Sequence, residues 1–403
     1  MTGRVAGTFR PDIEGLRAIA VGLVVLDHAG VAQLSGGFVG VDVFFVLSGF
    51  LITTLLLKER ENSGRTSLAG FYARRVRRIL PASTLVLIVT MVGASAWLGA
   101  GPASRVAEDA RWSALFASNV RFIQQGTDYF AAGLATSPLQ HFWSLAVEEQ
   151  FYLVWPAIMI LVGFVSVGAR FRPTLGLVLV FVITASLAWS VYETAVNGTV
   201  AYFSPLPRAW ELATGALVAV WAPRLVELPR LMGVAASIAG IVAILAAALL
   251  FNGSTPFPGY AVALPVIGSA AAIAGGTIAP GVGAERLLGR PIFQWLGLRS
   301  YSLYLWHWPI LIIVPAIIGR LLSLGESLLA CCFALGLAAV TFAVVEAPIR
   351  NSRRLRSAPP LRTLTLGGLL VIVAVALGTG LLTVYRAPSN PAGPPPEIVF
   401  PPN

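Results

Sequence analysis

Arg17 and His28 lie 11 residues apart in one apolar stretch, IEGLRAIAVGLVVLDHAG. Histidine can act as a general base near neutral pH, and arginine can bind phosphate. At about 100° per residue, this spacing returns to within about 20° of the same helix face, so we expect both side chains to face one internal channel. The alternative is that Arg17 anchors the helix at lipid head groups and His28 is a hydrogen-bonded polar residue.

A cluster of arginines precedes the third apolar stretch, in the sequence FYARRVRRILPA. Its members are Arg74, Arg75, Arg77 and Arg78. Guanidinium groups beside an aromatic residue such as Tyr72 could bind a polyphosphate and stack on a purine. The alternative is a basic anchor that binds anionic lipid at the inner face.

Other ionisable residues also lie in apolar surroundings, where each costs roughly 2.5 to 3.5 kcal/mol on insertion scales and is a functional candidate. Glu148 and Glu149 are adjacent carboxylates at the start of the fourth stretch, and they need compensation by cations or hydrogen bonds. Further candidates along a substrate channel are Ser48, His141, Ser144, Arg208, Glu211, Arg299, Tyr301 and His307.

The second apolar stretch, GGFVGVDVFFVLSGFLIT, combines four glycines with Asp42. Glycines allow close approach of helices in a bilayer, so we interpret them as packing positions. Asp42 lies deep in its segment and needs a cationic partner such as Arg17 or Arg208. Arg208 itself could pair with Glu211 at i, i+3 on one helix.

Composition identifies the chain as a membrane protein, because 57% of its residues are hydrophobic and only 11% are charged. An average soluble domain has roughly 25% charged residues. A disordered, fibrous or nucleic-acid-binding chain is likewise excluded, so no nucleic-acid partner is expected. With three histidines and two adjacent cysteines, Cys331 and Cys332, we expect neither a metal site nor a disulfide framework.

Eleven stretches are long and apolar enough to cross a hydrocarbon core of about 30 Å. We predict an all-α polytopic membrane helix bundle with spans near residues 16–35, 38–57, 79–99, 142–163, 174–191, 205–221, 231–251, 260–278, 295–318, 326–346 and 363–384. We expect no cleaved secretory signal within the first 30 residues, because Arg17, Asp27 and His28 interrupt the first stretch. Of the 28 lysines and arginines, 20 fall in alternate loops and five in the others, which predicts an N-terminus inside and a C-terminus outside.

Two segments do not fit this pattern of spans. Residues 100–141 carry apolar side chains at helical spacing, which predicts a helix lying in the membrane interface. Those side chains are Trp112, Leu115, Phe116, Val120 and Ile123. Residues 387–403 are rich in proline and read as an extended linker. We divide the chain into a membrane domain at 1–350, a basic cytoplasmic linker at 351–362, a further membrane helix at 363–384 and an outer tail or linker at 385–403.

The order of these motifs resembles the acyltransferase-3 family of integral membrane O-acyltransferases. The resemblance covers residues 9–351 and includes FRPDIEGLRAIAVGLVVLDHAG, HFWSLAVEEQFYLVWP, GLRSYSLYLWHWPI and VEAPIRN, together with the glycine-rich and arginine-rich segments. It implies a ten-span core in the plasma (inner) membrane that transfers an acyl group, often acetyl, from cytoplasmic acyl-CoA. The acceptor would be a hydroxyl of a cell-surface glycan or glycolipid, or in some members a small molecule such as a macrolide.

Family members fused to an SGNH-hydrolase-like domain carry an eleventh span and a linker, which residues 363–403 resemble. No Gly-Asp-Ser motif occurs in the given sequence. We therefore expect either a member cut at the linker, or a member that acts alone or with a separate SGNH-like domain or protein on the outer face.

The resemblance places the family's arginine and histidine on Arg17 and His28, its basic loop on Arg74 to Arg78 and its glutamate pair on Glu148 and Glu149. We expect His28 to be the general base, oriented by Asp27 or Asp42. Arg17 would hold the pyrophosphate or polarise the thioester, and the basic cluster would hold the 3′-phosphate and adenine. Direct attack by the acceptor is favoured over an acyl-enzyme on Ser48 or Ser144, because neither serine has a base beside it in the sequence.

Two other classes of function stay open at this point. In a secondary transporter or flippase, the intramembrane Arg, His and Glu residues would be substrate or proton sites. That class predicts substrate movement without dependence on acyl-CoA. In a non-catalytic scaffold for a partner enzyme, His28→Ala would leave acyl transfer unchanged.

Overall fold

A computed structural model describes residues 10–127, 129–130, 136–166 and 168–386. Within these ranges the chain is helical and has no β-strand, which confirms the prediction of an all-α bundle. Each predicted span corresponds to one long helix. These helices are α1 (Pro11–His28), α2 (Gly40–Ser63), α3 (Leu68–Trp97), α6 (Phe142–Val165), α7 (Phe171–Val196), α9 (Ala209–Leu225), α10 (Arg230–Leu250), α11 (Ala263–Ile278), α13 (Pro291–Ile318), α14 (Leu324–Thr341) and α17 (Pro360–Arg386).

Eight membrane-length apolar segments occur in the described part of the chain. They contain α2, α3, α6, α7, α10, α13, α14 and α17. Of the other three long helices, α11 is apolar but shorter, while α1 carries several charged residues. The structure is therefore that of a polytopic membrane helix bundle. The count of eleven spans and the inside position of the N-terminus stay predictions.

The first helix differs from its predicted span of 16–35. It begins at Pro11, whose fixed φ suits the first helical position, and acidic Asp12 and Glu14 lie in its first turn. It ends at His28, because the chain turns at Gly30 with φ 84°, a left-handed conformation that favours glycine. His28 is therefore at the end of the helix and not within its length.

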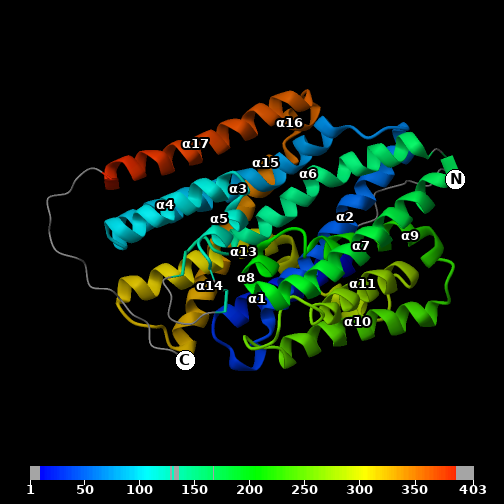
Figure 1. Cartoon of the computed structure of the whole chain (residues 1–403), viewed down its shortest axis with the longest axis horizontal. Helices are drawn as coiled ribbons and strands as arrows, with labels where there is room; N and C mark the ends of the chain where they lie inside the picture. Colours follow the sequence, from blue (N-terminus) through cyan, green and yellow to red (C-terminus); the bar gives the residue numbers. More distant parts are fainter. Residues whose placement is uncertain (1–9, 128, 131–135, 167, 387–403) are drawn as a thin grey trace.

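The segment predicted to form an interfacial helix forms two helices, α4 (Ala100–Ala114) and α5 (Ser118–Gln124). They are separated at Phe116, which has φ 52°. Helix α4 packs along α3 and α17, and α17 lies on one side of the bundle with α10 and α11 on the opposite side (Figure 1). The proline-rich tail at residues 387–403 lies outside the described residues.

Close helix packing around α2 depends on its glycines, as the sequence predicted. A Cβ on Gly49 would overlap the backbone carbonyl of Leu212 in α9, and a Cβ on Gly215 would overlap that of Val46. A Cβ on any of the glycines at 36, 37 and 40 would also overlap a neighbouring backbone carbonyl, although less closely. Because no side chain intervenes, α2 and α9 approach backbone to backbone.

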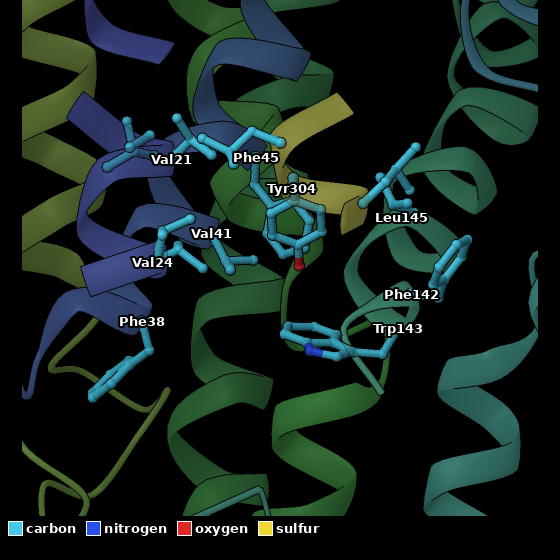
Figure 2. Packing of buried hydrophobic residues seen from close by; sticks show 14 of the residues in the cluster. Val21, Val24, Phe38, Val41, Phe45, Phe142, Trp143, Leu145 and Tyr304 are labelled. Atoms are coloured by element: carbon cyan, nitrogen blue, oxygen red, sulfur yellow. The ribbon is translucent and has the colours of Figure 1, made fainter. Parts of the chain in front are cut away.

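The centre of the bundle is an apolar core to which α1, α2, α6 and α13 contribute. Figure 2 shows Val24, Phe45, Leu145 and Tyr304 converging there from these four helices. The Tyr304 hydroxyl projects from this core beside the Trp143 ring (Figure 2). The polar residues of interest therefore lie against a rigid apolar wall.

Short helices complete the inner and outer edges of the bundle. Helix α14 continues through a π-helical turn at Phe342–Glu346 into α15 (Ala347–Asn351) and α16 (Arg353–Ser357). Helix α8 (Gly198–Phe203) follows α7, and α12 (Glu285–Leu288) precedes α13. The α15–α16 segment packs beside the start of α3, which carries the arginine cluster.

Candidate active site

A cavity of about 710 Å³ is bounded by α1, α2, α3, α6, α13 and the α15–α16 segment. This volume is within the range of about 300–1,000 Å³ that is typical of ligand pockets. Two acidic residues line it, Glu14 and Glu148. The cationic lining residues are Arg10, Arg17, Lys58, Arg74, Arg75, Arg77, Arg78, Arg350 and Arg356. Such an excess of positive charge suits a polyanionic ligand.

The arginine cluster predicted from the sequence lines this cavity in full, but its members differ in their partners. Arg74 pairs with Glu59 at 2.6 Å and Arg75 pairs with Glu149 at 2.6 Å. Within the described residues, Arg78 makes neither an ion pair nor a hydrogen bond, and the same is true of Lys58. Their charges are therefore available to an anionic ligand.

Glu148 is the centre of a hydrogen-bond network at the cavity wall. Its Oε1 accepts from the Ser48 hydroxyl at 2.9 Å and from the Tyr152 hydroxyl at 2.6 Å. Arg75 lies 3.4 Å from the same oxygen and compensates the charge, as the sequence required. The serine thus has a carboxylate beside it, which sequence reasoning missed. Because Oε1 already accepts several hydrogen bonds, Glu148 orients the Ser48 hydroxyl and is a poor base for it.

His28 is held through both ring nitrogens. Its Nδ1 lies 3.0 Å from Nε2 of His307, and its Nε2 lies 2.8 Å from the hydroxyl of Tyr129. Both partners come from segments remote in sequence, so sequence spacing does not link them to His28. Tyr129 in particular was missed by sequence reasoning, because it lies in the segment between α5 and α6 that showed no motif.

The backbone determines where the protons lie in this chain of hydrogen bonds. The Leu303 carbonyl can only accept, so Nδ1 of His307, 3.2 Å away, carries the hydrogen. In a neutral ring, Nε2 of His307 then accepts from Nδ1 of His28, which leaves Nε2 of His28 as an acceptor. Burial raises the pKa of the Tyr129 phenol well above its usual range, so the phenol stays protonated. It therefore donates a hydrogen bond to Nε2 of His28.

All three histidines of the chain gather in this region. The His141 and His307 rings are 5.6 Å apart, and Nε2 of His141 donates to the Leu305 carbonyl at 3.2 Å. Among the described residues, no group of His, Cys, Asp and Glu has an arrangement that could hold a metal ion. The cluster is therefore a set of hydrogen-bonded and packed rings.

Arg17 and His28 do not line one common channel, contrary to the expectation from their spacing. Arg17 lines the cavity and pairs with Glu14 at 3.1 Å. His28 is outside the lining, because His307 and Trp308 pack against its ring.

The cavity reaches the 2.7 Å hydrogen bond between Ser144 and Tyr304. The Tyr304 ring is 5.4 Å from His307, which is fully buried. A layer of rings therefore separates the cavity from His28.

Asp42 belongs to a buried ion triad and does not pair with His28. Arg208 donates to Asp42 at 2.7 Å and to Glu211 at 3.0 Å, as both sequence expectations required. Asp42 was also expected to orient His28, as an alternative to Asp27. That expectation is wrong, because both ring nitrogens of His28 are taken by His307 and Tyr129.

Two further candidates lie away from the cavity. Tyr72 donates to the Leu153 carbonyl at 3.0 Å and is absent from the lining, whereas its neighbour Phe71 is part of it. The Arg299 guanidinium lies 4.2 Å from the Trp295 ring and is absent from the lining too. By contrast Tyr301 lines the cavity, with its hydroxyl bonded to the Ile79 carbonyl at 3.0 Å.

The chain is similar to known proteins over most of its length. A family model described as an acyltransferase domain matches residues 10–345. The chain is 34% identical over 365 residues to the peptidoglycan O-acetyltransferase OatA of Listeria monocytogenes, covering 87% of this chain and 57% of that relative. It is 33% identical over 313 residues to "Putative peptidoglycan O-acetyltransferase YrhL" of Bacillus subtilis, covering 75% and 49%. The chain thus spans about half the length of these relatives. No solved structure matches it.

Proposed function

Because the chain belongs to the acyltransferase-3 family, we propose that it transfers an acyl group, acetyl in the simplest case, from cytoplasmic acyl-CoA to a hydroxyl of a cell-surface glycan. The observation that carries the proposal is the cation-lined cavity, whose far end lies one layer of rings from His28. Two of the relatives are named for peptidoglycan, which makes peptidoglycan the first acceptor to test.

The cavity residues fit a CoA thioester. CoA carries a diphosphate and a separate 3′-phosphate, and guanidinium groups bind phosphate through paired hydrogen bonds. Arg78 and Lys58 form no ion pair among the described residues, and Arg17 lies further inside. The thioester end then points towards Ser144 and Tyr304, whose hydroxyls bond each other and the His141 carbonyl. These hydroxyls would turn to donate to the oxygen of a tetrahedral intermediate.

His28 acts as the general base on the acceptor side. The Tyr129 hydroxyl demonstrates that an oxygen fits 2.8 Å from Nε2, which is the distance that proton transfer needs. The acceptor hydroxyl passes its proton to the Tyr129 oxygen as its own oxygen bonds to the acyl carbon, and Tyr129 passes its phenolic proton to Nε2 of His28. The thioester C–S bond breaks, and the proton passes on to the CoA thiolate. The rings of Tyr304 and His307 must move for the acyl group to reach this point.

The remaining organisation is part of the same proposal. Residues 1–350 form the catalytic domain of a multi-pass plasma membrane protein with its N-terminus in the cytoplasm. Residues 363–384 add a further span, and the tail at 385–403 leads to the outer face. An SGNH-like domain or protein there would receive or position the glycan.

The first experiment measures binding of acetyl-CoA to the full chain in detergent by calorimetry. Arg78→Ala should raise the Kd about tenfold, because one charge-assisted phosphate contact is lost and no carboxylate is left unpaired. The matched control is Arg65→Ala, which removes an exposed arginine outside the cavity lining. A folded wild-type protein that binds no acetyl-CoA would contradict the proposal and favour a transporter.

A second experiment tests catalysis with radiolabelled acetyl-CoA and purified peptidoglycan. His28→Ala should abolish transfer and leave donor binding intact, because His28 lies outside the cavity. Retained transfer in this variant would contradict the assignment of the base.

A further inference from the structure

We propose that the segment after the family-matched region supplies part of the donor-phosphate site, with Arg356 binding the 3′-phosphate of the CoA donor. This inference rests on the proposed function, and it gives a role to a segment that the sequence analysis interpreted only as a basic linker. The family model ends at residue 345, yet both Arg350 and Arg356 line the cavity.

The fold brings this segment to the cavity through a short series of local contacts. Ser352 caps α16 by accepting from the Leu355 amide at 3.4 Å. The Leu355 carbonyl in turn accepts from Arg77 of α3 at 3.5 Å. Helix α16 is therefore tied to the helix that carries the arginine cluster, and the two elements border the cavity together.

The exposure of the cationic side chains distinguishes the inner end of the cavity from its mouth. The side chains of Arg17 and Arg75 are 10% and 12% exposed, whereas those of Arg350 and Arg74 are 28% and 44% exposed. Arg356 is also exposed. The α15–α16 segment thus lies at the mouth of the cavity, whereas the buried residues Ser144 and Tyr304 lie at its inner end.

This depth matches the order of groups along a CoA thioester. The acyl group is at one end of the molecule, and the ribose with its 3′-phosphate is at the other. If the thioester lies beside Ser144, the 3′-phosphate lies at the mouth. A phosphate monoester carries close to two negative charges at neutral pH, so it favours a pair of guanidinium groups. Arg77 and Arg356 form such a pair, since Arg77 bonds the backbone next to Arg356.

Arg356 is the best placed arginine of its segment for this role. Arg350 pairs with the buried Glu346 at 3.1 Å, which compensates its charge. Arg356 instead donates to the neutral side chain of Asn351 at 2.7 Å and pairs with no carboxylate among the described residues. Its neighbours on α16, Arg353 and Arg354, are exposed and do not line the cavity.

The experiment compares two donors, acetyl-CoA and acetyl-dephospho-CoA, which lacks only the 3′-phosphate. Calorimetry on the full chain in detergent would give the Kd of each donor for the wild type, Arg356→Ala and Arg354→Ala. We expect the wild type to bind acetyl-CoA about tenfold more tightly than the dephospho donor. Arg356→Ala should lose most of this preference and keep only what Arg77 supplies, while Arg354→Ala, with the same change in net charge, should keep all of it.

Several outcomes would overturn the inference. Equal weakening of both donors in Arg356→Ala would mean a general charge effect or a site for an anionic lipid head group. An unchanged preference in that variant would remove Arg356 from the donor site. If the wild type binds acetyl-CoA and acetyl-dephospho-CoA equally tightly, the 3′-phosphate does not contact the protein. A wild type that binds neither donor would instead refute the proposed function. Arg356→Lys, which keeps the charge, should retain part of the preference and serves as a second folded variant.

Discussion

Nδ1 of His28 lies 3.0 Å from Nε2 of His307, so a second histidine orients the proposed base where many enzymes use a carboxylate. The Leu303 carbonyl determines the direction of the chain by accepting from His307. The neutral His307 ring keeps His28 in the tautomer that a base needs. Unlike a carboxylate, it adds no negative charge to the apolar bundle.

His307→Phe should lower kcat for acyl transfer about 100-fold, because His28 loses the acceptor that holds its Nδ1 hydrogen. The KM for acyl-CoA should not change, since His307 is outside the cavity lining. Steady-state kinetics with varied acyl-CoA would separate the two parameters. His307→Gln offers an amide oxygen in place of Nε2 and should recover part of kcat. An unchanged kcat in His307→Phe would refute the positioning role.

Tyr129→Phe tests the hydroxyl that donates to His28. The substitution keeps the ring, which stacks on Tyr202 with centroids 4.3 Å apart, and removes only the hydrogen bond. We expect kcat to fall about tenfold or more, because an organised donor beside the base is lost. In the double variant with His28→Ala, no further loss should occur, since the two groups act as a unit. Additive losses would indicate that Tyr129 acts elsewhere.

The helices and the local ion pair were predictable from the sequence. Apolar length located each long helix, and the i, i+3 spacing of Arg208 and Glu211 identified a pair within one turn. Asp42 could be linked to Arg208 because a buried carboxylate requires a cation and few were available. The end of α1 was not found, because the apolar pattern continues past the turn at Gly30.

The contacts between remote segments were not predictable in the same way. Tyr129 is 101 residues from His28 and His307 is 279 residues away, and no periodicity relates side chains on different elements. The spacing of Arg17 and His28 describes one helix only. Which cavity each side chain lines depends on the neighbouring helices, which the spacing does not reveal. From the sequence, Arg356 contributed only to the prediction of membrane orientation. The position of an arginine in a loop does not tell which cavity its side chain lines.

Arg208→Met should destabilise the protein by about 3–5 kcal/mol, because Asp42 and Glu211 are buried and would lose their cation. Unfolding in detergent by denaturant titration would measure the change in free energy. A triple variant that adds Asp42→Asn and Glu211→Gln replaces both carboxyl groups with neutral amides and should recover most of the loss. If the single and triple variants were equally stable, the ion triad would not be what holds α2 to α9.

Gly49→Ala should lower the free energy of unfolding by about 1–3 kcal/mol, because its methyl group would overlap the Leu212 carbonyl and force α2 away from α9. Gly336→Ala is the matched control: it lies in α14 with open space around the added Cβ, and alanine favours the helix over glycine. Donor binding should also weaken in Gly49→Ala, since its neighbour Ser48 lines the cavity and bonds Glu148. Equal stability of the two variants would mean that α2 and α9 can separate at little cost, and that the backbone contact does not fix the cavity wall.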